Sequence, residues 1–374
     1  MQNKGSKPNN IVASQSRLKD ECVELERELP DFLYDYFLYL RSSVATSTRH
    51  AYLLELRFFL NYLVMETSLT QAEEIKKISL KEFQSLSAKD INRFLSGYCS
   101  HYEKYLDGRR IVIENDNKSL SRKKSALAVM FKFLYRDGSL DYDISGGFNP
   151  IKIPKKQSDA IKRLEIEEVN LMMEAVTSGA GLAKSELRFW EKTKYRDRAI
   201  LLLFTTYGLR LKELWQLNVS SFDFDKEEFT VYRKRDKQVS MPINKSAKKV
   251  LQDYLELERP GNEELDEEDR DALFLSLRKK RITEKAIRNL VKKYTSIALK
   301  SSRRQGYSPH KLRATTASAL IEYGFSIFDV QNLMDHDHVT TTQLYAQHRK
   351  HAKKEIIDDY ELLDERERKG SESR

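Results

Sequence analysis

The stretch PHKLRATTASAL, residues 309–320, sets a histidine and an arginine three positions apart, directly after a proline and before small and apolar residues. Proline is favoured in the first turn of a helix, so the stretch predicts a helix that begins here. A spacing of three places His310 and Arg313 on one face of that helix. Both side chains can therefore reach a single ligand.

A second arginine interrupts an apolar run in TTYGLRLKEL, residues 205–214. Arg210 follows Gly208 at the end of a stretch whose other residues favour burial, so its guanidinium must be paired or bind an anion. Glu213, three residues on, offers an intrahelical salt bridge as the simpler explanation. If Arg210 and Arg313 approach one anion beside His310, the three side chains form a cradle for a phosphate.

Phosphoryl transfer also needs a nucleophile and a proton donor for the leaving oxygen. The segment TTTQLYAQH, residues 340–348, supplies Tyr345, with His336 just upstream. Because the ordinary pKa of a phenol is near 10, such a nucleophile needs an electropositive site. Lys234 and Lys237, at the tip of a predicted hairpin, are candidate general acids. Tyr345 is one of 19 tyrosines, so the constellation carries the hypothesis rather than the tyrosine.

Length and composition set the frame for these residues. The 374 residues suit two globular domains, and the net charge of +9 favours a polyanionic partner without identifying it. Two cysteines, Cys22 and Cys99, indicate neither a disulfide framework nor a cysteine zinc site. The absence of a signal peptide and of a long apolar run predicts a cytoplasmic protein with no membrane partner.

Several classes of chemistry lose support. No Walker loop, dinucleotide fingerprint or GxSxG elbow occurs, which argues against nucleotide hydrolysis, hydride transfer and the common serine hydrolase design. The histidines of HDH at 336–338, with His348 and His351, lack the carboxylate pattern of a known metal motif. We therefore expect no metal.

Hydrophobic periodicity predicts a mainly α protein with a small β-sheet, that is, an α+β fold. We expect a flexible segment over residues 1–27, a helical bundle without strands over 28–148, a basic linker over 149–163, a second domain over 164–350 and a tail over 351–374. In the second domain, the alternation of EEFTVYRKRDKQVSMPI predicts a short hairpin turned at KRDK, residues 234–237.

The second half resembles the catalytic domain of the tyrosine recombinases, or phage integrase family, and its Xer-like members in particular. The matching motifs are GLRLKEL with Arg210 and Glu213, SPHKLR with His310 and Arg313, LMDH with His336, and TTTQLY with Tyr345. The intervals of 26 residues from His310 to His336 and 9 from His336 to Tyr345 are typical of these proteins. Lys234 stands about where the family's hairpin carries its lysine, and Lys237 is a weaker candidate.

Three positions depart from the family pattern. Ala314 stands where many relatives have a second histidine, and Met334 and Asp335 replace the common Leu and Gly before His336. None of these changes removes a catalytic group. The first half is similar to the family's SAM-like core-binding domain, through TRHAYLLELRFFLNYL and through the segment from SLSRKKSALAVMFKFLYRDG to the linker.

The resemblance implies a site-specific recombinase that cleaves and rejoins duplex DNA. Tyr345 would attack a phosphodiester and form a 3′-phosphotyrosine, while Arg210 and Arg313 would stabilise the phosphate charge. Lys234 would protonate the leaving 5′-oxygen, His310 would assist proton transfer at the tyrosine, and His336 would orient the phosphate. The covalent bond conserves the energy of the phosphodiester, so neither a cofactor nor a metal is required.

The expected partners are double-stranded DNA with a specific recombination site, further copies of the chain in a homotetramer, and an accessory protein. Basic residues of a predicted helix over 118–138 and of the linker are candidate DNA contacts, with a solvated basic face as the alternative; they are Arg122, Lys123, Lys124, Lys155 and Lys156. The tail is either donated to a neighbouring protomer or packed on its own domain. We expect the protein at the nucleoid.

Two rival functions stay open. A type IB topoisomerase uses the same chemistry but relaxes supercoils without a partner site, and the helical first domain argues against it. A DNA-binding relative that has lost catalysis is disfavoured because all six catalytic positions are filled. The sequence does not choose between resolving chromosome dimers and integrating or excising a mobile element, and it does not give the DNA target.

Overall fold

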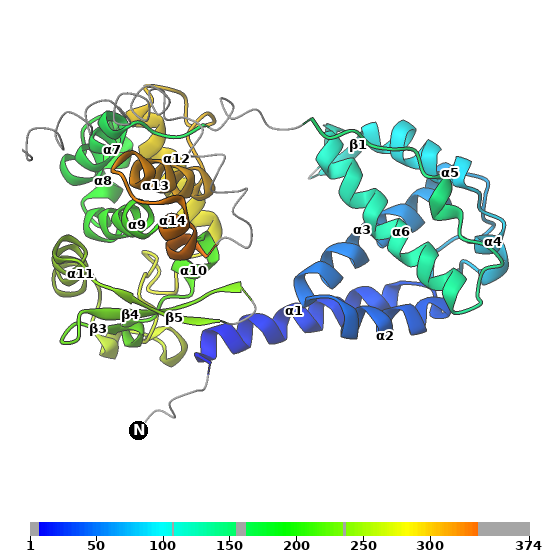
Figure 1. Ribbon diagram of the computed structural model, residues 1–374, viewed down its shortest axis with the longest axis horizontal. Helices are drawn as coiled ribbons and strands as arrows, with labels where there is room; N and C mark the ends of the chain where they lie inside the picture. The colour runs from blue at the N-terminus through cyan, green and yellow to red at the C-terminus, as the bar shows by residue number, and fades with distance from the viewer. Residues whose placement is uncertain (1–6, 107, 155–161, 235–236, 336–374) are drawn as a thin grey trace, which may run out of the picture. The chain divides into compact units, whose positions relative to one another are not determined.

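The computed structural model describes residues 7–106, 108–154, 162–234 and 237–335. The chain forms two compact units, Met1–Lys155 and Lys156–Arg374, here called the first and second units and described separately (Figure 1).

The first unit is built from helices around a core of aromatic and aliphatic side chains. Leu56, Phe59 and Phe131 are fully buried in it, and the rings of Phe83 and Phe131 stack with centroids 5.2 Å apart. Its helices are α1 (Asn9–Glu28), α2 (Tyr34–Ser43), α3 (Thr46–Glu66), α4 (Leu80–Gln84), α5 (Ala88–Asn92) and α6 (Asn117–Arg136). The predicted helical character of this half is confirmed.

Helix α1 corrects the expectation of a flexible segment over residues 1–27 for its helical part, Asn9–Glu28. Cys22 and Leu25 lie on its buried face, and α1 packs against α3. The carboxylate of Glu26, also buried, accepts a hydrogen bond from Arg49 Nε at 2.9 Å. A narrow apolar stripe and a buried ion pair therefore hold this mostly polar helix in place. The composition of the segment predicts neither of them.

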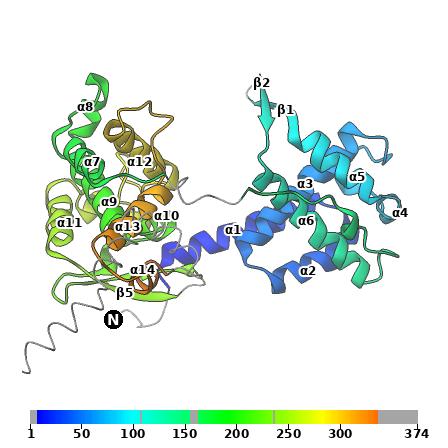
Figure 2. The same ribbon diagram turned by 45° about the horizontal axis from the view of Figure 1, so that its top comes forward.

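A β-hairpin corrects the expectation of a first half without strands. Strands β1 (His101–Leu106) and β2 (Arg109–Glu114) are antiparallel, and Figure 2 shows them extending away from the helices of their unit. The β-branched residues of RRIVIE favour a strand. The hairpin packs on the unit through Tyr102, whose ring lies 5.1 Å from that of Phe58.

The second unit combines helices with a three-stranded antiparallel sheet of order β3-β4-β5. The strands are β3 (Phe222–Asp223), β4 (Glu228–Tyr232) and β5 (Gln238–Pro242), so the predicted hairpin is confirmed and gains a short third strand. The helices are α7 (Ile166–Ser178), α8 (Lys184–Trp190), α9 (Lys194–Tyr207), α10 (Leu211–Trp215), α11 (Lys245–Leu257), α12 (Glu284–Ala298), α13 (Pro309–Glu322) and α14 (Ile327–Met334).

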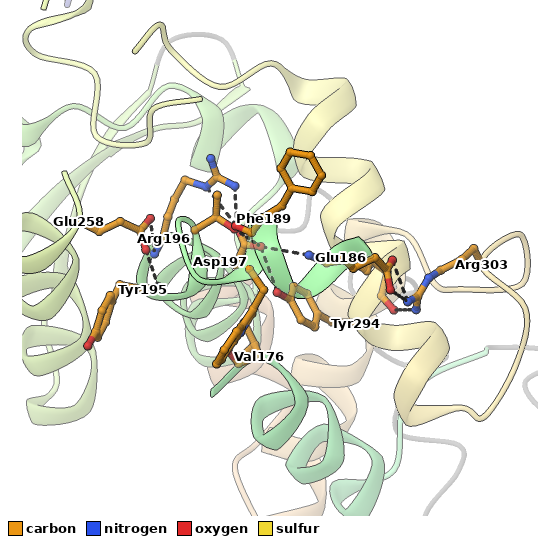
Figure 3. A network of polar contacts seen from close by, with 12 residues as sticks. Val176, Glu186, Phe189, Tyr195, Arg196, Asp197, Glu258, Tyr294 and Arg303 are labelled. Carbon is orange, nitrogen blue, oxygen red and sulfur yellow. Dashed lines mark hydrogen bonds and ion pairs between the residues drawn. The ribbon is translucent and has the colours of Figure 1, made fainter. Parts of the chain in front are cut away.

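Helix α9 lies in the core of this unit, and buried polar contacts fix its first turn (Figure 3). The Asp197 carboxylate accepts hydrogen bonds from Arg196 Nη2 at 2.7 Å and from the Tyr294 hydroxyl at 3.1 Å. Glu258 accepts from the backbone N–H of Tyr195 at 2.8 Å, and its burial raises its pKa to about 7. These contacts join α9 to α12 and to the end of α11. Among the described residues, no helix has the length and apolar character to cross a bilayer.

Candidate active site

The site begins at the carboxyl end of α9, where Gly208 closes the helix. Gly208 has a φ of 57°, in the left-handed region that glycine adopts without strain. A Cβ added at Gly208 would also clash with the side chain of Met334 and lie 3.6 Å from Thr316 Cβ. The left-handed turn therefore favours glycine here, and a larger residue would also have to displace the end of the Met334 side chain.

Arg210 follows this turn and caps α10 together with Glu213. The buried Glu213 carboxylate accepts the Arg210 backbone N–H at 2.8 Å and Arg210 Nη1 at 2.7 Å. The predicted salt bridge is thus present. It fixes the orientation of the Arg210 guanidinium, whose Nη2 also donates to the Asp335 carbonyl. The Arg210 side chain remains 34% exposed, so an external anion can reach it.

Helix α13 brings Arg313 to the same place. The small residues at positions 314–318 are buried along this helix, which lets α13 approach α9 closely. Thr316 Oγ1 donates to the carbonyl oxygen of Phe204 in α9 at 3.0 Å. Arg313, only 4% exposed, donates from Nη1 to the Gly208 carbonyl at 2.5 Å and from Nη2 to the Met334 carbonyl.

Three guanidinium groups meet at the carboxyl end of α14. Arg233 donates to the Leu333 carbonyl at 2.6 Å, Arg313 to that of Met334, and Arg210 to that of Asp335 at 2.8 Å. The last carbonyl oxygens of a helix lack intrahelical partners and carry its negative dipole end, so cations are favoured there. The three arginines come from the end of β4, from α13 and from the start of α10, and they are fixed around the consecutive residues 333–335.

Asp335 adds a carboxylate to this cluster. It is in the left-handed region, with a φ of 51°, and its Oδ1 lies 3.0 Å from Lys237 Nζ and its Oδ2 3.8 Å from Arg210 Nη1. Partial burial acts to raise the pKa of Asp335, but the Lys237 hydrogen bond and the charges of Arg233 and Arg210 hold it below the ordinary value. Asp335 is therefore an anion within the cluster at neutral pH.

The remaining predicted catalytic residues fall into two groups. His310 is exposed on the first turn of α13, one turn before Arg313, and Lys234 is exposed directly after Arg233. His336 and Tyr345 lie outside the described residues, which end at Asp335 in the arginine cluster.

The candidate DNA contacts of the first unit divide differently. Lys123 is buried, ion-paired with Glu55 of α3 and placed over the Phe58 ring, so we withdraw it as a phosphate contact. Arg122 is exposed and also pairs with Glu55, while Lys124 donates to the Asn149 carbonyl at 2.8 Å. Lys155 and Lys156 lie outside the described residues.

Two residues of the cluster escaped the sequence reasoning, Arg233 and Asp335. A signal for Arg233 was present, because Phe229, Val231 and Arg233 alternate along one strand and its extension, and period-two alternation places them on one face. All three are buried. Asp335 was noted only as a departure from the family pattern.

Other chemistry-bearing groups of the described residues lie apart from this cluster. Asp266, Glu268 and Asp269 bring carboxylates together, but Lys280 Nζ lies 2.8, 3.4 and 3.8 Å from them and supplies the cation. A hollow lined by Phe189, Asp197 and Leu277, among others, lies at the opposite end of α9 from Gly208.

The arrangement can bind and polarise an oxyanion. Arg210, Arg233, Arg313 and Lys237 place four cations around the carboxylates of Glu213 and Asp335, which leaves two positive charges in excess. Guanidinium groups present several N–H donors in a fixed plane that matches phosphate oxygens. The partly exposed Arg210 and the exposed His310 and Lys234 can supply binding and proton transfer at such a phosphate.

Comparison with known proteins gives one consistent result. Residues 162–352 match the model of the phage integrase family. The tyrosine recombinase XerC of Natranaerobius thermophilus is 30% identical over 282 residues, which cover 74% of this chain and 84% of that protein.

Two solved structures share the fold. The XerH site-specific recombinase bound to palindromic difH substrate has a TM-score of 0.59 at 16% identity, covering 96% of this chain and 90% of that one. A lambda integrase tetramer bound to a Holliday junction has a TM-score of 0.57 at 16% identity, covering 85% of this chain and 77% of that one.

Proposed function

The chain belongs to the phage integrase family of tyrosine recombinases, and from this premise we propose that its arginine cluster holds the phosphodiester that the enzyme breaks and rejoins. Family membership makes the chain an enzyme of site-specific DNA recombination, as the sequence motifs predicted. Within that activity, each residue of the site takes a distinct role.

The observation that carries the proposal is the convergence of Arg210 and Arg313. They come from different helices, yet they donate to the carbonyl oxygens of consecutive residues, Asp335 and Met334. Phosphate oxygens would bind further N–H groups of the partly exposed Arg210 and compete with the Met334 carbonyl for Arg313. Because these positive groups are held in place before the reaction begins, they stabilise the negative charge that develops on the phosphate in the transition state.

The remaining roles come from the chemistry of cleavage. Tyr345 attacks the phosphorus to form a 3′-phosphotyrosine, and Lys234 gives a proton to the departing 5′-oxygen. His310 assists proton transfer at the tyrosine, and His336 orients the phosphate. Tyr345 follows Asp335 by ten positions, which span at most about 35 Å, and this length limits how far the attacking oxygen can lie from the arginine cluster.

DNA is the proposed macromolecular partner, with a specific recombination site that the first unit helps to bind. Arg122 and Lys124 of α6, with Lys155 and Lys156 of the linker, are the proposed backbone contacts. We extend to this chain the tetrameric assembly named for the lambda integrase structure, with the tail over 351–374 donated between protomers and an accessory protein directing the outcome. Action at the nucleoid follows from the DNA substrate.

A plasmid assay separates recombination from the topoisomerase alternative. The purified full chain first selects a binding site from random duplex DNA, and two copies of that site are placed in one supercoiled plasmid. Recombination yields two circles or an inverted segment, with Tyr345→Phe as the inactive control. Relaxation without exchanged segments would instead assign a type IB topoisomerase function, and no change in the plasmid would leave only DNA binding.

A further inference from the structure

Arg233 directly follows strand β4, which ends at Tyr232, at the start of the turn that carries Lys234 and Lys237. The β4–β5 hairpin with these lysines is called the lysine hairpin. It continues the buried face of β4 that carries Phe229 and Val231, and it is only 6% exposed. Its backbone N–H donates to the Lys237 carbonyl at 2.8 Å, which closes the base of the hairpin tip. The residue thus sits inside the fold while its neighbour, Lys234, is exposed.

The Arg233 side chain reaches from the sheet to α14. Nη2 donates to the Leu333 carbonyl at 2.6 Å and lies 3.5 Å from the Met241 sulfur of β5. Among the described residues, Nε is buried and has no hydrogen-bond partner. One guanidinium therefore ties both strands of the hairpin to the helix end that also receives Arg210 and Arg313.

Joining the strand to the helix through a buried guanidinium has an unfavourable desolvation free energy. Burial lowers the pKa of Arg233, while Glu213 and Asp335 act to raise it and Arg210 to lower it further. A well-packed apolar side chain at such a position is often neutral or stabilising compared with a buried charge. The arrangement is therefore better explained by what it positions than by the stability it adds.

We propose that Arg233 is a positioning residue for the recombination reaction, which locks the lysine hairpin to the end of α14 so that Lys234 and the phosphate-binding arginines act on one phosphodiester. This inference rests on the proposed function. Arg233 itself does not touch the phosphate; it acts through Lys234.

The chemistry defines which step the lock serves. In cleavage, His310 takes the proton of the Tyr345 hydroxyl, a bond forms between the Tyr345 oxygen and phosphorus, and the bond from phosphorus to the 5′-oxygen breaks. The 5′-oxygen takes a proton from the Lys234 ammonium, which becomes a neutral amine. A displacement of the lysine by about 1 Å is enough to slow such a step by about 10²-fold.

Sulfur in place of the leaving 5′-oxygen gives a test specific to this step. A thiol has an ordinary pKa near 8.5, far below that of an alcohol, so the thiolate leaves without a proton. A defect in proton donation is therefore rescued on the sulfur substrate. A defect in folding, in DNA binding or in phosphate stabilisation is not.

The experiment measures single-turnover cleavage of both substrates, built on the selected binding site. Arg233→Met keeps length and apolar packing, Lys234→Ala removes the proton donor, and Arg281→Met is the matched control. Arg281 likewise donates to backbone carbonyls, those of Trp215 and Leu217, away from the hairpin. Thermal unfolding and DNA binding are measured for each variant, and Arg233→Lys, which keeps the charge, serves if Arg233→Met does not fold.

We expect Arg233→Met to cleave the oxygen substrate about 10²-fold more slowly. On the sulfur substrate it should fall within about threefold of the unchanged protein, as Lys234→Ala does, because no proton is needed there. Arg281→Met should affect both substrates equally.

Equal slowing of Arg233→Met on both substrates, or no slowing on the oxygen substrate, overturns the positioning role while leaving the proposed function intact. If Lys234→Ala itself is not rescued by sulfur, the assignment of Lys234 in the proposed function is wrong, and the inference fails with it.

Discussion

Arg210 and Arg313 donate hydrogen bonds to the carbonyl oxygens of adjacent residues, Asp335 and Met334, at the carboxyl end of α14. Arg210 caps α10 and Arg313 lies in α13, so the two side chains reach this point from separate helices. Their surroundings differ, because Arg210 is partly exposed and Arg313 is buried. From this difference we predict that Arg210 acts mainly on the substrate, whereas Arg313 also stabilises the fold.

Substitution of the two arginines should therefore have different effects. Arg210→Ala should slow DNA cleavage by about 10²- to 10³-fold, the usual loss for one preorganised charge-stabilising donor. Its free energy of unfolding should fall less than that of Arg313→Met, because the buried Glu213 carboxylate keeps the backbone N–H of residue 210 as a hydrogen-bond donor. Arg313→Met should slow cleavage too, and also lower the free energy of unfolding by about 3 kcal/mol, because two buried carbonyls lose a donor. Equal stability losses in both variants would contradict this division.

Neutralising Asp335 should strengthen DNA binding. Its carboxylate lies 3.0 Å from Lys237 and 3.8 Å from Arg210, where it opposes an incoming phosphate. Asp335→Asn keeps a residue that tolerates the left-handed backbone. We expect about tenfold tighter binding to the selected duplex at low salt, by the charge interaction removed. Glu256→Gln, an exposed change of equal charge on α11, is the control, and an equal gain there would indicate a net-charge effect alone.

Arg122 and Lys123 are neighbours on α6 with opposite expected roles. Lys123→Met leaves the buried Glu55 short of a partner, so the first unit should lose about 3 kcal/mol of stability while the folded protein keeps its DNA affinity. Arg122→Ala should weaken DNA binding. It should also make the slope of log binding constant against log salt concentration less steep by about 0.9, the value for one lost phosphate contact. The two variants are compared by denaturant unfolding and by binding across salt concentrations. The reverse pattern would restore Lys123 as a DNA contact.

The buried Glu258 gives the second unit a pH-dependent stability. Its folded pKa is about 7, above the ordinary value of 4.5, so the folded state binds the proton more tightly than the unfolded chain does. The stability from this group is fully present below pH 4.5 and is lost as pH rises through 7. Glu258→Gln should remove this part of the pH dependence, measured by denaturant unfolding at several pH values. An unchanged profile in the variant would contradict the assignment.

Local signals in the sequence predicted much of this site. Gly208 ends an apolar run, Glu213 follows Arg210 by three residues, and Pro309 begins the helix that carries Arg313. Each is a short-range pattern with a physical reason, and the structure has a helix end or start at each. The hairpin was equally visible, because its alternation extends over both strands.

Long-range partners explain what the sequence did not show. Lys123 looked like one of several basic residues on a helix face, but its carboxylate partner comes from α3. Helix α1 has few apolar residues, and its burial depends on the faces of other helices. The ion pairs of Asp335 with Lys237 and Arg210 join residues far apart in the sequence, so they depend on the tertiary fold. Sequence periodicity predicts elements and faces, whereas pairing between distant elements depends on packing.

The central claim is that the arginine cluster and Tyr345 act on one phosphorus, and trapping the covalent intermediate tests it most directly. The substrate is the selected duplex with a nick beside the cleavage position, so that the short released strand diffuses away and religation is prevented. We predict a covalent protein–DNA adduct with a free 5′-hydroxyl, lost in Tyr345→Phe and strongly reduced in Arg210→Ala. An adduct that persists in Tyr345→Phe, or that forms at an unchanged rate in Arg210→Ala, would contradict the account.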